Sequence, residues 1–393
     1  MALAQSPPDA PVITGQDPQS FARSVFRDRH PRLMEKLAAA LPYGPGQLAG
    51  LRQLLDETLH GQVTRLGEDA HDRTQWDESG ADFYDRNWTE IPFLWAESYF
   101  YRRLLSATGY FSGPWKGVDP FEPLKSAELH SDEADQELAA YDHIAGLAAE
   151  QQNTAMLAAS LWGNTSDLGF QITAGRTLGR GLLVDDGSAL WSYLRGSAPG
   201  RIDVVADNAA RELLPDLMLI DHLLATGLAT TLVLHLKERP YYVSDATVAD
   251  ANAAMRKLLK APGAAGEAGR RLWQACADGQ LTFAANPFFC GPHTYHDLPR
   301  TLSGELAGST LTILKGDLNY RRLVGDRHWP ATTSFQSLVD YFPGRAVAAL
   351  RTCKSDVAVG LDAQTAARLD ADEPDWRVGG THAVIQLRRP ESA

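Results

Sequence analysis

Residues 202–208 have the sequence Ile-Asp-Val-Val-Ala-Asp-Asn, and this short segment decides the fold that we expect. Its β-branched residues are typical of a buried strand, and an apolar helical pattern follows from Glu212 to Gly227. The alternation is repeated by a strand pattern at 230–236 and a helical pattern at 245–260. Strands that alternate with helices predict βαβ units, and therefore a parallel sheet that is covered by helices on both faces.

Further strand patterns extend this predicted sheet. They cover residues 281–285, 309–314 and 346–350, and a closing strand or hairpin is expected within 377–388. The predicted fold class is therefore α/β, with a three-layer α/β/α core and a mostly parallel sheet.

The first part of the chain has a different pattern. From Phe21 to about Thr154 the apolar residues recur at helical spacing, and no segment has the alternation of a strand. We therefore expect a flexible tail at residues 1–19, a helical domain at 20–168 and an α/β/α domain at 169–393.

Composition narrows the classes of function. Hydrophobic residues make up 44% of the chain and charged residues 22%, as in ordinary globular proteins. The net charge of −12 and the lack of a dense Lys/Arg run argue against nucleic acid as a partner. The most apolar stretch, 213–236, is interrupted by charged residues, so no membrane contact is expected. Three scattered cysteines and no signal-peptide pattern in residues 1–17 predict a cytoplasmic protein, whose oligomeric state the sequence leaves open.

Polar residues follow the predicted strands at the points where the strands end. Because the carboxyl ends of parallel strands lie at one edge of a sheet, and ligands bind there in open α/β folds, these residues are candidates for one site. They are Asp207 and Asn208, Asp245, the segment Lys315 to Arg321, and Arg351 with Lys354.

The types of side chain indicate a chemistry. Asp207, Asn208 and Asp245 offer hard oxygen donors without cysteine, which suits Mn²⁺ or Mg²⁺. A cation there would polarise a phosphoryl group and lower the pKa of a bound water. Basic residues would neutralise the phosphate, and Glu212 would bind a substrate hydroxyl or orient the water. The basic candidates are Arg321, Arg351 and Lys354, with Lys315 as a further one. From the helical part, Glu97 and Arg27 are expected to reach this cleft.

Several longer blocks carry a resemblance to a known family. They are Ser160-Leu-Trp-Gly-Asn164 with Asp167, Asp207-Asn208 with Glu212, Val243-Ser-Asp245, Leu314-Lys-Gly-Asp-Leu-Asn-Tyr-Arg-Arg-Leu323, and Arg351-Thr-Cys-Lys354. In these blocks the chain resembles the damage-control phosphatase family, and more narrowly its sugar-phosphate branch with an Arg-Thr-x-Lys motif. A relative in that branch is also described as a protein-glutamate methyltransferase.

The resemblance implies a helical domain on an α/β/α core and a phosphatase supported by Mn²⁺, Co²⁺ or Ni²⁺. It implies fructose 1-phosphate, fructose 6-phosphate and related small phosphorylated metabolites as substrates. The implied metal ligands are Asp207, Asn208 and Asp245, and the implied substrate contacts are Glu212, Asp317, Leu318, Asn319, Tyr320, Arg321 and Lys354. Members of the family commonly have a glycine between the Asn and the Glu, where this chain has Ala209-Ala-Arg211. We expect alanine to be tolerated at this helix start, and the substrate preference to be affected.

Three other functions are weighed against this one. A methyltransferase using S-adenosylmethionine usually has a glycine-rich turn after its first strand, and the turn at 207–211 contains no glycine. A phosphatase with an aspartyl nucleophile in an Asp-x-Asp pair is disfavoured, because Ala209 stands two residues after Asp207. A sugar-phosphate-binding protein without catalysis stays open, because binding and hydrolysis would use nearly the same groups.

Overall fold

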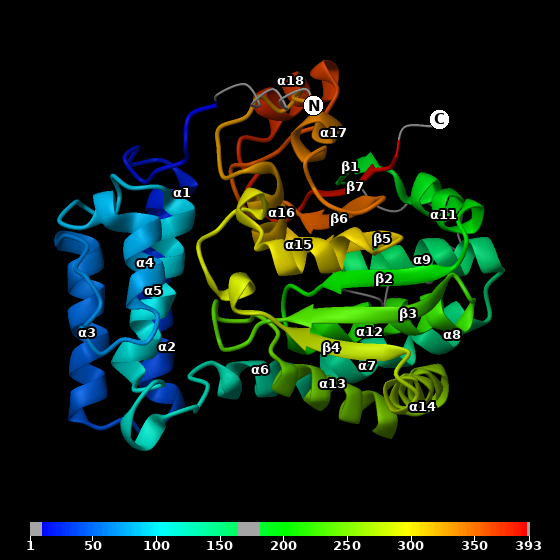
Figure 1. The fold of residues 1–393 in the computed structure, drawn as a ribbon, viewed down its shortest axis with the longest axis horizontal. Helices are drawn as coiled ribbons and strands as arrows, with labels where there is room; N and C mark the ends of the chain where they lie inside the picture. Colours follow the sequence, from blue (N-terminus) through cyan, green and yellow to red (C-terminus); the bar gives the residue numbers. More distant parts are fainter. Residues whose placement is uncertain (1–9, 164–180, 391–393) are drawn as a thin grey trace.

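The computed structural model describes residues 10–163 and 181–390. A group of helices lies beside a seven-stranded sheet in the order β1-β7-β6-β5-β2-β3-β4, and further helices cover both faces of the sheet (Figure 1). The strands are β1 (Leu182–Asp185), β2 (Gly200–Val205), β3 (Ala229–Leu236), β4 (Leu281–Ala285), β5 (Leu311–Lys315), β6 (Val347–Thr352) and β7 (Ala383–Arg388).

The sheet is mostly parallel, as the sequence predicts. From β6 through β5, β2 and β3 to β4 all neighbouring strands run parallel, whereas β7 is antiparallel to β6 and parallel to β1. In the centre, Val204 of β2 pairs with Leu234 of β3 and with Ile313 of β5. These side chains are buried, since helices cover both faces, and the α/β prediction is confirmed.

The first helices of the chain form a layer that lies beside the sheet and does not cover its faces. Figure 1 shows α1 to α5, in blue and cyan, as a separate group at the side of the sheet. This helical unit comprises α1 (Phe21–Ser24), a π-helical turn η1 (Val25–Arg29), α2 (His30–Ala40), α3 (Pro45–His60), α4 (Arg73–Gly80), the 3₁₀ turn η2 (Ala81–Phe83) and α5 (Phe93–Thr108).

The remaining helices belong to the α/β part or lead into it. Before β1 they are η3 (Gly113–Trp115), α6 (Glu122–Leu129), α7 (Asp132–Ala139), α8 (Tyr141–Ala145) and α9 (Ala149–Trp162). After β1 they are α11 (Gly187–Gly196), α12 (Ala210–Ala225), α13 (Val248–Lys260), α14 (Gly263–Ala277), η4 (Pro287–Cys290), η5 (Tyr295–Asp297), α15 (Arg300–Ala307), α16 (Gly316–Val324), α17 (Phe335–Val339) and α18 (Ala363–Asp372). No helix within the described ranges is long and apolar enough to cross a membrane.

Two large hydrophobic cores hold these layers together. One contains Leu138 of α7, Tyr141 of α8 and Leu157 of α9, and these residues pack with Ile202 of β2 and Leu213 of α12. Helices α7 to α9 therefore share a core with the sheet. In the expected division of the chain they belong to the helical domain at 20–168.

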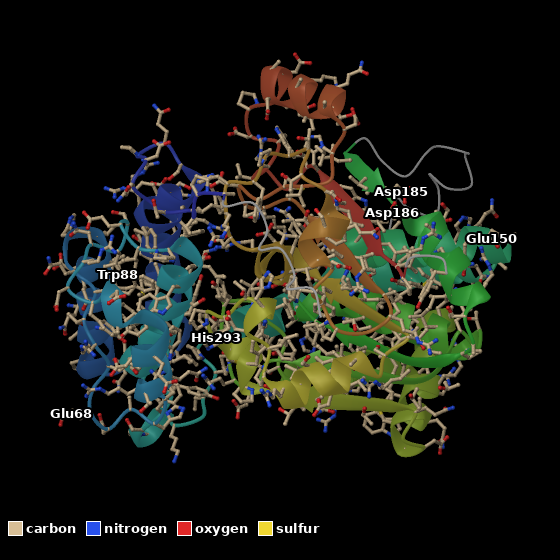
Figure 2. All side chains as sticks on the ribbon, turned by 45° about the horizontal axis from the view of Figure 1, so that its top comes forward. Glu68, Trp88, Glu150, Asp185, Asp186 and His293 are labelled. Atoms are coloured by element: carbon tan, nitrogen blue, oxygen red, sulfur yellow. The ribbon has the colours of Figure 1, made fainter. Side chains whose placement is uncertain are left out.

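The other core joins the helical unit to the opposite face of the sheet. It contains Trp88 and Phe100 together with Val205 and Leu314. Figure 2 shows Trp88 inside the helical unit, and His293 on the side of the α/β part that faces it.

The described part of the expected tail lies against the α/β part. Val12 forms an isolated bridge with Arg327, and the backbone N–H of Ile13 donates to the carbonyl of Asp326 at 3.2 Å. Ile13 is buried, so this segment packs rather than hanging free. Residues 1–9 lie outside the described residues.

Candidate functional site

Two loops at the ends of β2 and β3 are joined by backbone hydrogen bonds. The N–H of Ala209 donates to Ser244 at 2.6 Å, and the N–H of Ala246 donates to Asp207 at 2.9 Å. Asn208 and Asp245 form an antiparallel bridge between these two bonds. This pairing brings the three predicted oxygen donors together, although they are separated in the sequence.

The three donors line one cavity of about 220 Å³ between the helical unit and the sheet edge. Other sides of the cavity are formed by Glu97 of α5 and by Lys354 in the loop after β6. The lining residues are Phe21, Val25, Arg29, His30, Leu33, Glu97, Tyr101, Asp207, Asn208, Tyr242, Val243, Ser244, Asp245, Asp317, Leu318, Arg321 and Lys354.

Hydrogen bonds fix the amide of Asn208. Its Nδ2 donates to Glu212 Oε2 at 3.0 Å, and its Oδ1 accepts from the Ser244 hydroxyl at 2.7 Å. A carbonyl oxygen has two lone pairs, so Oδ1 keeps one for a further ligand. Glu212 is in the first turn of α12, as expected, and this places it beside the donors.

The electrostatics of this cavity fit a cation. Burial, Glu212 and Asp245 raise the pKa of Asp207 well above its usual value, while Lys354 and Lys237 act in the opposite direction. A bound divalent cation would relieve the repulsion between these carboxylates. The donors are oxygen atoms of Asp207, Asn208 and Asp245, which suits a hard cation such as Mn²⁺ or Mg²⁺.

Asp317 anchors the loop that carries Lys354. The Asp317 Oδ1 atom accepts from Arg351 Nε at 2.8 Å, from the Ser355 hydroxyl at 3.0 Å and from the backbone N–H of Lys354 at 3.2 Å. Burial would raise the pKa of Asp317, but the nearby Arg351 and Arg321 and these hydrogen bonds outweigh it and hold the pKa below its usual value.

The Lys354 ammonium lies 3.6 Å from Glu212 Oε1, and both side chains are nearly half exposed, at 46% and 44%. Burial lowers the pKa of Lys354, but the nearby carboxylates of Glu212, Asp207 and Asp317 raise it by more, so the net shift is upward. This lysine is therefore a cation at the cavity. Arg351 itself is buried beneath Asp317 and does not line the cavity.

Gly316 is a site residue that the sequence does not single out. It has a φ of +81°, and a Cβ atom on it would lie 1.8 Å from Asp207 Oδ2. The residue must therefore be glycine for Asp207 to hold its position. The Lys-Gly-Asp sequence at 315–317 is the available signal, but Gly-Asp is also ordinary turn chemistry.

Ala210 departs from the expectation that alanine is tolerated at the start of α12. Its φ is +54°, in the left-handed region that favours glycine. The expectation is wrong in this respect, because the left-handed conformation costs roughly 1–2 kcal/mol for a residue with a Cβ atom. A glycine at this position would avoid that cost.

Arg321 connects the cavity to the helical unit. Its guanidinium donates to both carboxylate oxygens of Asp326, at 2.8 and 3.0 Å, and to Glu97 Oε2 at 2.9 Å. Tyr242 also donates to Glu97 Oε2, at 3.3 Å. Glu97 therefore does reach the cleft from the helical unit, and it is bound there by a residue of α16.

Other members of the predicted substrate segment point away from the cavity. Asn319 Nδ2 donates to the carbonyls of Lys315 and Ala206, at 2.8 and 3.2 Å, and the Tyr320 hydroxyl donates to Gln386 at 2.8 Å. The Lys315 ammonium lies 3.0 Å from Asp216 in the interior. Of this segment, Asp317, Leu318 and Arg321 line the cavity.

In the helical unit, Arg27 is exposed and forms an ion pair with Asp28 at 2.8 Å. The expectation that Arg27 reaches the cleft is therefore wrong. Arg29 and His30 line the cavity instead. Burial, together with Arg29, lowers the pKa of His30 to about 3, so the imidazole is neutral. Asn164 and Asp167 lie outside the described residues.

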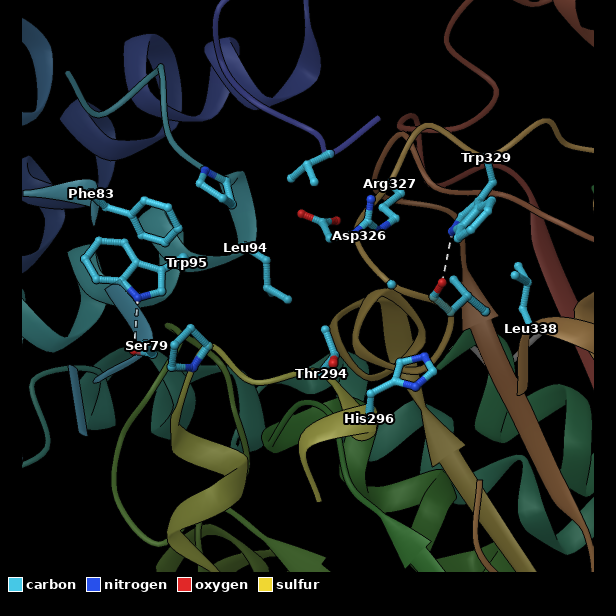
Figure 3. Close-up of a pocket in the computed structure, with 15 residues that line it drawn as sticks. Ser79, Phe83, Leu94, Trp95, Thr294, His296, Asp326, Arg327, Trp329 and Leu338 are labelled. Carbon is cyan, nitrogen blue, oxygen red and sulfur yellow. Dashed lines mark hydrogen bonds between the residues drawn. The ribbon is translucent and has the colours of Figure 1, made fainter. Parts of the chain in front are cut away.

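A larger cavity, of about 510 Å³, is lined by Asp326 (Figure 3), whose partner Arg321 lines the smaller cavity. Figure 3 shows Phe83, Leu94 and Trp95 on one side of it and Trp329 and Leu338 on the other. Asp326 borders this cavity, but both its carboxylate oxygens already bind Arg321. The oxygen donors converge in the smaller cavity, and we therefore place the site there.

A solved structure shares this fold. It is a DUF89 family protein from Pyrococcus horikoshii, with a TM-score of 0.51 and 14% sequence identity. The match covers 94% of this chain and 98% of that chain. The fold is thus that of a DUF89 protein.

Sequence comparison gives the family. Residues 25–369 match the damage-control phosphatase ARMT1-like domain, and the chain belongs to this family. Damage-control phosphatase ARMT1 of Danio rerio is 31% identical over an alignment 429 positions long, which covers 94% of this chain and 95% of that protein. The Xenopus tropicalis and Mus musculus proteins of the same name are 31% and 27% identical, over 77% and 99% of this chain and 76% and 100% of their own lengths. The resemblance to damage-control phosphatases is confirmed.

Proposed function

We propose that this chain is a metal-dependent phosphomonoesterase that acts on small sugar phosphates such as fructose 1-phosphate and fructose 6-phosphate. The observation that carries the proposal is the convergence of Asp207, Asn208 and Asp245 with the Lys354 ammonium in one cavity. Membership of a phosphatase family supports it. The proposed cation is Mn²⁺, with Ni²⁺, Co²⁺ and Mg²⁺ as alternatives that the same oxygen donors would accept.

A divalent cation held by the three donors would supply charge for the phosphoryl oxygens and acidify the attacking water. In the reaction a bond forms between the water oxygen and phosphorus and the ester P–O bond breaks. The water loses a proton and the sugar oxygen gains one, so the sugar leaves as its alcohol. Lys354 would neutralise charge on the phosphoryl oxygens as it develops. Glu212, which accepts a hydrogen bond from Asn208, would orient the water or a sugar hydroxyl.

The size and lining of the cavity support a small polar substrate. Its volume of about 220 Å³ suits a single phosphorylated metabolite, and no nucleic acid or membrane partner is proposed. Opposite the donors, Arg29, Glu97 and Tyr101 offer polar groups for hydroxyls. The preference for a phosphorylated ketose rests on the resemblance to the sugar-phosphate branch, and a cytoplasmic location, where such metabolites arise, is part of the proposal.

A turnover assay tests the proposal. Purified protein with Mn²⁺ is expected to release inorganic phosphate from a panel of sugar phosphates, to lose activity with a chelator and to regain it with Mn²⁺. Asp245→Ala is expected to lower kcat/KM by more than about a hundredfold, because even indirect changes at metal sites cost tenfold to a hundredfold. Asp278→Ala, at an exposed position after α14, is the control.

Full turnover in Asp245→Ala would contradict the assignment. Tight binding of the same sugar phosphates without turnover would favour a binding protein, and saturable binding of S-adenosylmethionine in calorimetry would favour the methyltransferase alternative.

A further inference from the structure

Lys237 is a buried cation directly after β3. The side chain is 2% exposed, and its ammonium has no hydrogen-bond partner among the residues that the structure describes. The nearest carboxylate atom recorded is Asp245 Oδ2, at 3.4 Å. The ammonium also lies 5.7 Å from the centroid of the Tyr241 ring.

Stability alone does not explain this arrangement. Moving an ammonium out of water is costly unless its N–H groups are satisfied, and a single buried ion pair often repays only part of the cost. The cation–π contact with the Tyr241 ring attracts the charge but supplies no oxygen acceptor, so it does not satisfy the N–H groups. Buried polar groups that lack partners are uncommon in proteins, and they require an explanation in function or in a bound ion.

The explanation lies in how the Asp245 carboxylate is held. Its Oδ2 atom faces Lys237 and is 3.4 Å from the backbone N–H of Tyr242, whereas Oδ1 has no hydrogen bond to any described residue. Asp245 lines the cavity with Asp207 and Asn208. The Oδ2 atom is therefore contacted by Lys237 and Tyr242, and the Oδ1 atom is free for a ligand.

We infer that Lys237 is a positioning residue: it fixes Oδ2 of the Asp245 carboxylate and leaves Oδ1 available to the cation. This inference rests on the proposed metal-dependent function. The main chain of Lys237 has a separate task, because its N–H donates to the carbonyl of Ala246 at 2.9 Å and keeps the two loops paired. A change confined to the side chain therefore leaves that pairing in place.

The test is the Mn²⁺ dissociation constant of the whole protein, measured by calorimetry. Lys237→Met keeps the length of the side chain and removes the charge. It is expected to weaken Mn²⁺ binding about tenfold, the scale on which partners of metal ligands act. Lys237→Arg, which retains a cation at this position, is expected to restore most of the affinity.

Arg102→Met is the matched control. Arg102 is a buried cation paired with Asp72 at 2.6 Å, and it does not line the cavity. Its loss should lower stability and leave the Mn²⁺ affinity unchanged. If Lys237→Met does not fold, Lys237→Gln replaces it, with an expected loss of about threefold since its amide can still donate to Oδ2.

The outcomes separate the two proposals. Wild-type protein that binds no Mn²⁺ would overturn the proposed function. Wild-type protein that binds Mn²⁺, with equal or tighter binding by the folded Lys237→Met or Lys237→Gln variant, would overturn the role of Lys237 alone. An equal loss in Arg102→Met would show a general effect of destabilisation and would also overturn it.

Discussion

Gly316 allows the Asp207 carboxylate to occupy its place in the cavity. In Gly316→Ala, the new Cβ would meet Asp207 at 1.8 Å in a backbone conformation that alanine rarely adopts. We expect a loss of at least about 2 kcal/mol in the free energy of unfolding. We also expect loss of Mn²⁺ binding, because Asp207 must move.

Denaturant unfolding and calorimetry measure the two effects. Gly304→Ala is the matched control, because Gly304 lies in helix α15 with no atom within 4 Å of the added Cβ. That variant is expected to be as stable as the wild type or up to about 1 kcal/mol more stable. Normal metal binding by Gly316→Ala would show that Asp207 is not held in this way.

At the residue scale, the sequence predicted the oxygen donors but not which arginine faces them. Arg27 was the arginine of the helical part that was expected to reach the cleft, yet the segment Val25–Arg29 forms a π-helical turn. Such a turn contains more residues than an α-helical one, so the following side chains point in directions that regular spacing does not predict. Arg29 and His30 therefore line the cavity, and Arg27 is exposed.

At the scale of elements, helix α16 is tied to the end of β2 by one side chain. Asn319 is fully buried, donates to the carbonyls of Ala206 and Lys315, and accepts from the Tyr295 hydroxyl at 2.9 Å. Asn319→Ala removes the side-chain partner of the Ala206 carbonyl and of the Tyr295 hydroxyl, whereas the Lys315 carbonyl at the start of α16 still accepts the first helical bond from the backbone N–H of residue 319. We expect a loss of about 2–4 kcal/mol in the free energy of unfolding, since each unsatisfied group costs roughly 1–3 kcal/mol.

The same variant tests whether Asn319 contacts substrate. Because its side chain points away from the cavity, KM should change less than about threefold at a temperature where the variant is folded. A large rise in KM with unchanged stability would instead support the substrate contact that the resemblance implies.

Strands β2 to β7 and their order along the chain could be predicted, because each has a β-branched or apolar run of suitable length, whereas the four-residue strand β1 was not predicted. The packing of α7 to α9 on the sheet could not, since periodicity shows that a helix has an apolar face and not which surface covers it. The pairing of Asn208 with Asp245 could not be predicted either, because it depends on hydrogen bonds between the loops that follow two adjacent strands.

At the scale of the whole molecule, Glu97 joins the helical unit to the α/β part. It accepts from Arg321 at 2.9 Å, and both residues are buried. In Glu97→Gln the Arg321 guanidinium keeps both bonds to Asp326, so the fold should survive with a loss of about 1–3 kcal/mol.

Faster amide hydrogen exchange in α5, with smaller changes in the central strands, is expected for the same variant, because this contact crosses between the two parts. Arg27→Gln breaks an exposed pair on the surface and is expected to leave stability and exchange as they are. Exchange in Glu97→Gln equal to that of the wild type would show that the apolar core alone holds the two parts together.

The position of β7 also has a consequence for how the chain is made. Strand β1 pairs with β7, and the N–H of Leu387 bonds to Asp186, 201 residues earlier in the chain. During synthesis β1 leaves the ribosome long before its partner exists, while β2 to β5 can already pair with one another. The sheet thus closes last at the β1 edge, and a ribosome stalled shortly before residue 383 would carry a chain whose central strands are protected from protease and whose β1 is not.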